Sequence, residues 1–132
     1  FQHCKMLFNI TLSKILNRKI TMLHSYKKYV KYRIKTPLPS YRQFPCVTPN
    51  FDNASRRMHK GFTAFIGSTP QLYGKWLSSV FEKFKPYSQE ENFIFINAWN
   101  EWAEGNHLEP DQKWLRKYLE ETKKNIDQYK KR

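Results

Sequence analysis

Residues 93–111 read FIFINAWNEWAEGNHLEPD, and this stretch decides the interpretation of the whole chain. Its first seven residues are a nearly continuous apolar run of strand length, typical of a parallel strand buried on both faces. Glu101 and Glu104 follow, three residues apart and flanked by Trp99 and Trp102. In parallel α/β folds, reactive groups gather just beyond the carboxyl ends of strands, so we expect chemistry here.

The two glutamates have the residue type and spacing of an acid–base pair. If residues 101–104 form one helical turn, both carboxylates share a face, with Cβ atoms about 5–6 Å apart. Burial beside aromatic rings and a neighbouring negative charge should raise the pKa of one carboxyl above that of the other. One neutral acid and one carboxylate in a dry, aromatic-walled pocket could cleave a glycosidic bond. Glu-x-x-Glu also occurs on solvated helix faces, so spacing alone does not decide.

Before this stretch, the sequence predicts a helix over 70–84. Thr69 is a good N-cap, Pro70 suits the first helical position, and Pro86 ends the segment. Apolar residues then recur at three- and four-residue steps, which predicts one buried stripe. The members of this stripe are Leu72, Tyr73, Trp76, Leu77, Val80, Phe81 and Phe84.

Other elements alternate around it. We expect a helix over residues 1–35, a short strand over Gln43–Thr48, a loop over 49–61 and a helix over Asp111–Tyr129. Alternating strands and helices imply an α/β fold with a parallel sheet and right-handed crossovers. Two predicted strands cannot complete a sheet core, and 132 residues are too few for a closed (β/α)₈ barrel of roughly 200 or more.

The formal net charge of +13 is concentrated in the first half of the chain. Residues 1–66 contain 13 Lys and Arg but a single acid, Asp52. Tyr26, Tyr29 and Tyr32 alternate with basic residues, which could suit a nucleic acid or an anionic membrane. Because no nucleic-acid motif accompanies the charge, we favour a solvated helix face and expect no nucleic-acid partner. A peripheral contact with an anionic membrane stays open.

The chain shows no pattern for a metal or cofactor. The four histidines lack ligand spacing, and the two cysteines, Cys4 and Cys46, are far apart. We therefore expect neither metal nor cofactor, and we predict a reducing, cytoplasmic setting. No run approaches the ~18–20 apolar residues of a membrane span.

The stretch from Phe95 onward resembles the signature of the WbsX-type glycosyltransferase family, also described as glycoside hydrolase family 99-like. The family reads close to F-I-N-A-W-N-E-W-A-E-G-x-x-L-E-P-D, which residues 95–111 match. Phe44-Pro45, Pro49, Asp52-Asn53 and Arg56 resemble its F-P-x-V-x-P-x-W-D-N-T-x-R segment, with Phe51 in place of Trp. Residues 67–70 resemble its G-S-T-P helix start. The resemblance covers about residues 24–122.

This resemblance implies a fold and an activity. The fold would be the C-terminal part of a TIM-like (β/α)₈ barrel, incomplete in this chain. The activity would be transfer or hydrolysis of glycosyl groups of bacterial surface polysaccharide, such as lipopolysaccharide O-antigen or capsule. The partners would be a glycan or sugar donor. We treat 1–132 as one partial domain, with a basic segment 1–23 and a basic helix end 123–132 outside the family-like region.

The resemblance also implies roles for particular residues. In the related endo-α-mannosidases the two glutamates of the motif are catalytic. Carried over, Glu101 would deprotonate the sugar 2-hydroxyl, giving an anhydro-sugar, and Glu104 would protonate the leaving oxygen. Substrate contacts would come from Trp99, Asn100, Trp102, Asp52, Asn53 and Arg56, although the last three could equally form a turn network. The alternative for the whole chain is a non-catalytic basic module that binds nucleic acid or an anionic membrane.

Overall fold

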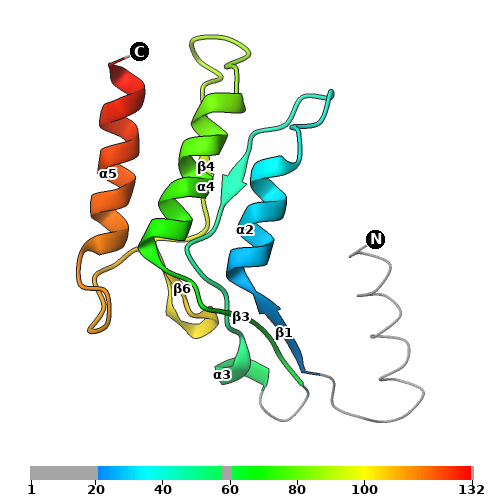
Figure 1. Cartoon of the computed structure of the whole chain (residues 1–132), viewed down its shortest axis with the longest axis vertical. Coiled ribbons are helices and arrows are strands. Elements are labelled where there is room, and N and C mark those ends of the chain that lie inside the picture. The colour runs from blue at the N-terminus through cyan, green and yellow to red at the C-terminus, as the bar shows by residue number, and fades with distance from the viewer. Residues whose placement is uncertain (1–20, 58–60, 132) are drawn as a thin grey trace.

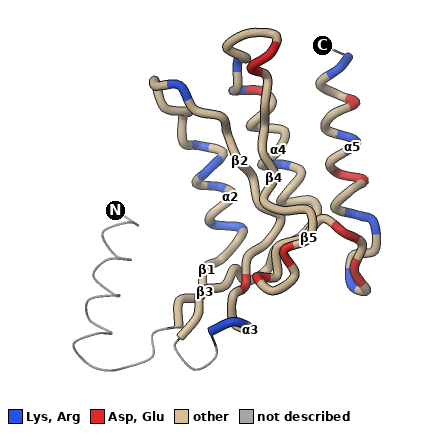
Figure 2. Tube along the Cα trace, turned by 180° about the vertical axis from the view of Figure 1, so that it is seen from behind, with Lys and Arg blue, Asp and Glu red and all other residues tan. Residues whose placement is uncertain are grey.

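The computed structural model describes residues 21–57 and 61–131. Three longer helices, α2 (Tyr26–Lys35), α4 (Pro70–Lys83) and α5 (Lys117–Lys130), lie side by side in one layer, with α4 in the middle (Figure 1). The short strands lie on the other side of this layer, as the view from behind shows (Figure 2). The chain is therefore mixed α/β, as the alternating pattern predicts. The smaller elements are β1 (Met22–Ser25), β2 (Cys46–Val47), α3 (Ala54–Arg57), β3 (Thr63–Ile66), β4 (Phe95–Ile96), β5 (Asn100–Glu101), the 3₁₀ turn η1 (Trp102–Glu104) and β6 (Asn106–His107).

The strands form three two-stranded sheets. β1 pairs with β3 and β2 pairs with β4, both in parallel, with Met22 opposite Thr63 and Cys46 opposite Phe95. β5 and β6 form an antiparallel hairpin. The parallel pairing of β2 with β4 confirms the prediction for the two strands that sequence analysis identified.

Helix α4 forms where its capping residues predict. The Thr69 hydroxyl accepts a hydrogen bond from the backbone N–H of Leu72, and Pro70 occupies the first turn. The helix ends at Lys83, one residue before the predicted end. Tyr73, Trp76 and Leu77 are buried, so the stripe faces the core as expected.

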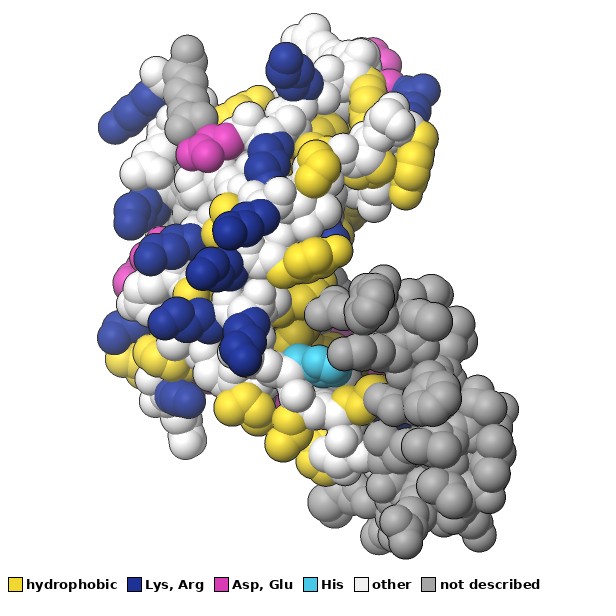
Figure 3. Space-filling model, turned by 45° about the vertical axis from the view of Figure 1, so that its right-hand side comes forward, with side chains coloured by type: hydrophobic (Ala, Val, Ile, Leu, Met, Phe, Trp, Pro, Cys, Tyr) yellow, Lys and Arg dark blue, Asp and Glu magenta, His cyan; other side chains and the backbone are white. Residues whose placement is uncertain are grey.

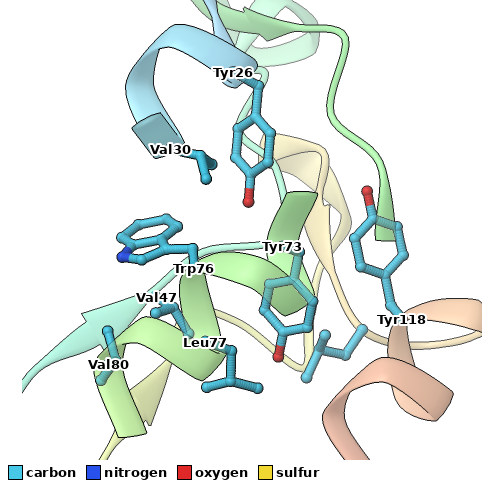
Figure 4. Close-up of a cluster of buried hydrophobic side chains, with 9 residues drawn as sticks. Tyr26, Val30, Val47, Tyr73, Trp76, Leu77, Val80 and Tyr118 are labelled. Atoms are coloured by element: carbon cyan, nitrogen blue, oxygen red, sulfur yellow. The ribbon is translucent and has the colours of Figure 1, made fainter. Parts of the chain in front are cut away.

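The core lies between α4, its two flanking helices and the ends of β2 and β4 (Figure 4). Three of its largest members are tyrosines whose hydroxyls are hydrogen-bonded. Tyr26 donates to the carbonyl of Thr48 at 2.6 Å, and the Tyr73 hydroxyl lies 2.9 Å from that of Thr122. These hydrogen bonds offset the desolvation penalty of burying the tyrosine hydroxyls in the core.

The predicted helix over 1–35 is wrong at residues 22–25, which form β1, and correct at 26–35. Ser25 caps α2 by accepting from the N–H of Lys28, so the helix begins only after it. Residues 1–20 lie outside the described part. The strand β3 was not predicted, although its β-branched and aromatic residues lie between Gly61 and Gly67, a recognisable strand signal. The predicted loop over 49–61 contains the short helix α3.

The apolar run is not buried on both faces. Phe93, Phe95 and Trp99 are 51%, 54% and 53% exposed, because β2 and β4 pair with no further strand in the described residues. The last helix begins at Lys117, not Asp111. Leu115 has a φ of 51°, which interrupts a helix, and the Asp111 carboxylate instead accepts from the N–H of Trp114 in a separate turn.

Candidate active site

The two glutamates lie on a tight hairpin directly beyond β4. Glu101 ends β5, and Glu104 ends the 3₁₀ turn η1. Glu101 lies just before this turn, and both carboxylates come to one side of the hairpin, where Arg56 lies within 3.9 Å of each. Gly105 then turns the chain with a φ of 55°, a left-handed conformation that glycine adopts without a steric penalty.

Arg56 brings the two carboxylates together. Its Nη1 lies 2.7 Å from Oε1 of Glu104 and 3.9 Å from Oε1 of Glu101. Arg56 comes from α3, 48 residues before Glu104, so the contact joins two segments that are distant in sequence. The hydrogen bond to Glu104 is charge-assisted, and such bonds are short and directional.

The α3 segment is fixed against η1 by backbone contacts. The N–H of Asp52 donates to the carbonyl of Glu104 at 2.6 Å, and the Ser55 hydroxyl donates to that of Ala103 at 2.6 Å. A Cβ on Gly105 would lie 3.1 Å from the Cβ of Asp52, so glycine also permits this close approach. These contacts place Arg56 over the carboxylates.

Asp52 and Asn53 use their side chains to shape this loop. Asp52 Oδ1 accepts from the N–H of Ala54 at 2.9 Å, and Asn53 Oδ1 accepts from the N–H of Thr63 at 2.8 Å. This is the turn network that sequence analysis left as the alternative to substrate binding. Of the three residues from this segment, Arg56 is the one with side-chain contacts to the glutamates in the described structure.

A second cluster supports the far side of the hairpin. The Trp102 ring stacks on that of His107 with centroids 3.7 Å apart, and Trp102 Nε1 donates to Oε2 of Glu109 at 2.6 Å. His107 Nε2 lies 3.1 Å from Oδ2 of Asp111. The histidines lack ligand spacing in the sequence, so no role was predicted for His107. The spacing of four residues between His107 and Asp111 is the sequence signal that could have predicted this contact.

Asn106 connects the hairpin to both strands of the β2–β4 sheet. Its side chain is fully buried, and Oδ1 accepts from the Thr48 hydroxyl at 2.9 Å and the N–H of Ala98 at 3.1 Å. Thr48 follows β2 and Ala98 follows β4, so one amide oxygen holds the hairpin against both strand ends. Nothing in the sequence singled out Asn106.

The dry pocket expected around the glutamates is not formed by the described residues. The side chains of Glu101 and Glu104 are 45% and 28% exposed, and Trp99 and Trp102 are about half exposed. With no further strand beside β4, nothing in the described residues covers the outer faces of these rings. Asn100 is likewise exposed. The arrangement is an open surface bearing two carboxylates, one guanidinium and two indoles.

The described residues thus form a mixed α/β unit with two carboxylates just beyond a parallel strand. Residues 2–122 match the family described as Glycosyltransferase WbsX, and the chain belongs to that family. The family match begins at residue 2, earlier than the resemblance over about residues 24–122, and it ends at the same residue, 122.

Two curated relatives come from Xanthomonas campestris pv. campestris. Both carry the description "Uncharacterized protein WxcX", one from strain B100 and one from strain ATCC 33913. Each is 38% identical over 91 residues, which is 68% of this chain but 13% of the relative. The chain thus spans a small fraction of the length of these relatives. No solved structure matches the chain.

None of the helices within residues 21–57 and 61–131 has the length and apolar content needed to cross a bilayer. The same residues contain no group of three or more His, Cys, Asp and Glu side chains placed to hold a metal ion.

Proposed function

We propose that this chain is the carboxylate-bearing part of an enzyme that transfers or hydrolyses glycosyl groups of bacterial surface polysaccharide. Glu101 is the base that takes the proton of the sugar 2-hydroxyl, and Glu104 is the acid that protonates the leaving oxygen. The observation that carries the proposal is that both carboxylates lie on one side of the hairpin, within 4 Å of Arg56.

The other site residues have supporting roles in this proposal. The exposed rings of Trp99 and Trp102 offer flat faces to the C–H faces of sugars. Asn100 and Arg56 supply hydrogen bonds to hydroxyl groups, and Asp52 and Asn53 act by shaping the loop that carries Arg56. A cationic guanidinium beside two carboxylates also limits their mutual repulsion before substrate arrives.

We further propose that the fold is the C-terminal part of a TIM-like barrel of the glycoside hydrolase family 99-like kind. β2 and β4 are adjacent and parallel, helices cover one of their faces, and the glutamates follow the carboxyl end of β4. These three features agree with two neighbouring βα units of a barrel. The exposed face of β4 would then point toward the remaining strands of the barrel.

Activity of the full-length protein tests the roles of the glutamates. Glu101→Gln and Glu104→Gln should each lower kcat by about 10²-fold or more, because each removes a proton-transfer group. A sugar with an activated leaving group needs little protonation. We therefore expect such a substrate to restore turnover in Glu104→Gln but not in Glu101→Gln.

Glu120→Gln is the matched control, since Glu120 is exposed on α5 and is distant in the chain from the hairpin. Full activity in both Glu101→Gln and Glu104→Gln would remove the catalytic assignment. Rescue of Glu101→Gln instead of Glu104→Gln would reverse the two roles. Product analysis with water or a glycan as acceptor separates hydrolysis from transfer.

The second candidate function is a basic binding module. Figure 3 shows Lys and Arg side chains spread over one face of the helical layer, and α2 has exposed Lys27, Lys28, Lys31 and Lys35 without any acid. A membrane with anionic lipids would attract such a face, by about 1 kcal/mol per basic residue near the surface. Retention on anionic vesicles or on RNA that falls steeply with salt would support this candidate.

A further inference from the structure

A cavity lies away from the glutamates, at the other end of β2. It has a volume of about 390 Å³ and is bounded by the end of α2, the segment 36–45 and the outer part of α4. The glutamates instead follow the carboxyl end of β4, at the end of the molecule where β5 and β6 lie (Figure 1). Nothing in the proposed glycosyl chemistry uses this cavity.

One wall of the cavity carries an arginine with an unused donor. The Nε–H of Arg33 is buried and has no hydrogen-bond partner within the described residues. The guanidinium carbon lies 5.8 Å from the centroid of the Trp76 ring, and Trp76 is itself 3% exposed. The indole thus supports the guanidinium from one side. Because the Nε atom itself has almost no accessible surface, a ligand in the cavity would contact the guanidinium through its Nη groups.

A second cation stiffens the same wall. Lys83 Nζ donates to the backbone carbonyl of Thr36 at 3.1 Å and also to that of Ile34. Those carbonyls belong to the end of α2, where a cation is favourable. Pro37, Pro39 and Pro45 line the adjoining segment and restrict its backbone. The cavity therefore exists before any ligand binds.

The lining combines positive charge with apolar surface. Arg33 and Lys83 are its charged residues, and no Asp or Glu lines it. Leu38, Val80, the prolines and the exposed ring of Tyr41 supply the rest of the wall. A planar guanidinium pairs best with carboxylate or phosphate, and the apolar wall suits a ring or hydrocarbon body.

We propose that this cavity binds an oxyanion, carboxylate or phosphate, carried on an apolar or ring-shaped body, with Arg33 as its anchor. The oxyanion accepts from the Nη–H groups of the Arg33 guanidinium, and the body lies against Tyr41 and the prolines. The source of the oxyanion can be a soluble ester or acid, or a lipid headgroup at a membrane surface.

The test is an NMR titration of the ¹⁵N-labelled 132-residue chain, observing the Arg33 Nε–H signal directly. The probes are benzoate, phenyl phosphate, inorganic phosphate and vesicles of phosphatidylglycerol. We expect a saturable shift of the signal with benzoate or phenyl phosphate and a weaker response to inorganic phosphate, which has no apolar body. Binding to the vesicles alone, if lost in Arg33→Gln, would support the lipid source.

Two variants and one control make the result decisive. Arg33→Gln should weaken probe binding by about tenfold or more, because a charge-assisted hydrogen bond is lost. Tyr41→Ala should weaken the binding of phenyl phosphate but not that of inorganic phosphate. Tyr41 is exposed, so its substitution should not disturb the core. Lys35→Gln removes the same charge from the same helix outside the cavity and should change affinity less than about twofold.

The proposal is overturned by any of three results. The first is an Arg33 Nε–H signal that does not move with any probe. The second is a loss of binding in Lys35→Gln as large as that in Arg33→Gln. The third is unchanged probe binding in both Arg33→Gln and Tyr41→Ala. Circular dichroism of each variant confirms that it is folded before the comparison is made.

Discussion

Among single residues, Asn106 makes the connection on which the glutamate hairpin depends. Its side-chain oxygen serves two donors that follow two different strands, and its burial excludes water as a replacement. Removing it leaves the Ala98 N–H without this acceptor, whereas the Thr48 hydroxyl can still donate to the carbonyl of Asn50 at 2.7 Å. Each buried donor left unpaired costs about 1–3 kcal/mol.

We therefore expect Asn106→Ala to lower the free energy of unfolding by about 1–3 kcal/mol, measured by urea denaturation. Asn92→Ala is the matched control, because Asn92 is exposed, and it should change stability by less than about 0.5 kcal/mol. Equal effects of the two substitutions would show that Asn106 does not hold the hairpin.

Single residues also show what sequence reasoning can and cannot reach. Glu101 and Glu104 were recognisable because carboxylates directly after an apolar strand are unusual. Asn106 was not, because an asparagine in a loop has many ordinary uses and its partners are 58 and 8 residues away. Arg56 was identified through the resemblance, and only the fold shows that it contacts both carboxylates.

At the scale of elements, α4 depends on a close approach to α5 at Gly74. A Cβ on Gly74 would collide with the carboxylate of Glu121 and would lie 3.3 Å from its Cβ. The small residue therefore sets how closely the two helices pack.

Gly74→Val should separate these helices and lower the free energy of unfolding by about 1–3 kcal/mol, the usual cost of overpacking. Lys75→Val places the same side chain on the exposed face of α4 and should have a much smaller effect. Thermal unfolding of both variants gives the comparison. A Gly74→Val chain as stable as the original would mean that the α4–α5 contact tolerates expansion.

Elements with strong local signals were predicted well, and those fixed by tertiary contacts were not. Thr69 and Pro70 define the start of α4 without help from the rest of the fold. The start of α5 was misplaced by six residues, because Asp111 caps a turn instead of the helix and Leu115 takes a positive φ. β1 was read as helix because its apolar spacing continues that of α2.

At the scale of the whole molecule, buried tyrosines link stability to pH. Burial raises the pKa of Tyr73 from 10.0 to about 12, and it also raises the pKa of Tyr26. The folded chain therefore keeps protons that the unfolded chain releases first. The stabilisation is complete below pH 10, the unfolded value, and is lost as the pH rises toward 12.

We expect the free energy of unfolding to fall between about pH 10 and about pH 12, as tyrosines of the unfolded chain ionise at about pH 10. Tyr73→Phe should reduce this slope, and Tyr41→Phe, at an exposed position, should leave it unchanged. Urea denaturation across the pH range measures the slope, and absorbance at 295 nm follows tyrosinate formation. A slope identical in all three chains would contradict the assignment.

Uncovered strand edges have a consequence for how copies of this chain behave in solution. Within residues 21–57 and 61–131 no third strand pairs with β2 or β4, and the exposed rings of Phe93 and Phe95 lie in or next to β4, so this edge is a template for pairing one copy with another. The charge of +13 opposes such contacts by long-range repulsion between copies. Since that repulsion fades within about 8 Å at physiological ionic strength, the isolated chain should lose colloidal stability as salt is added.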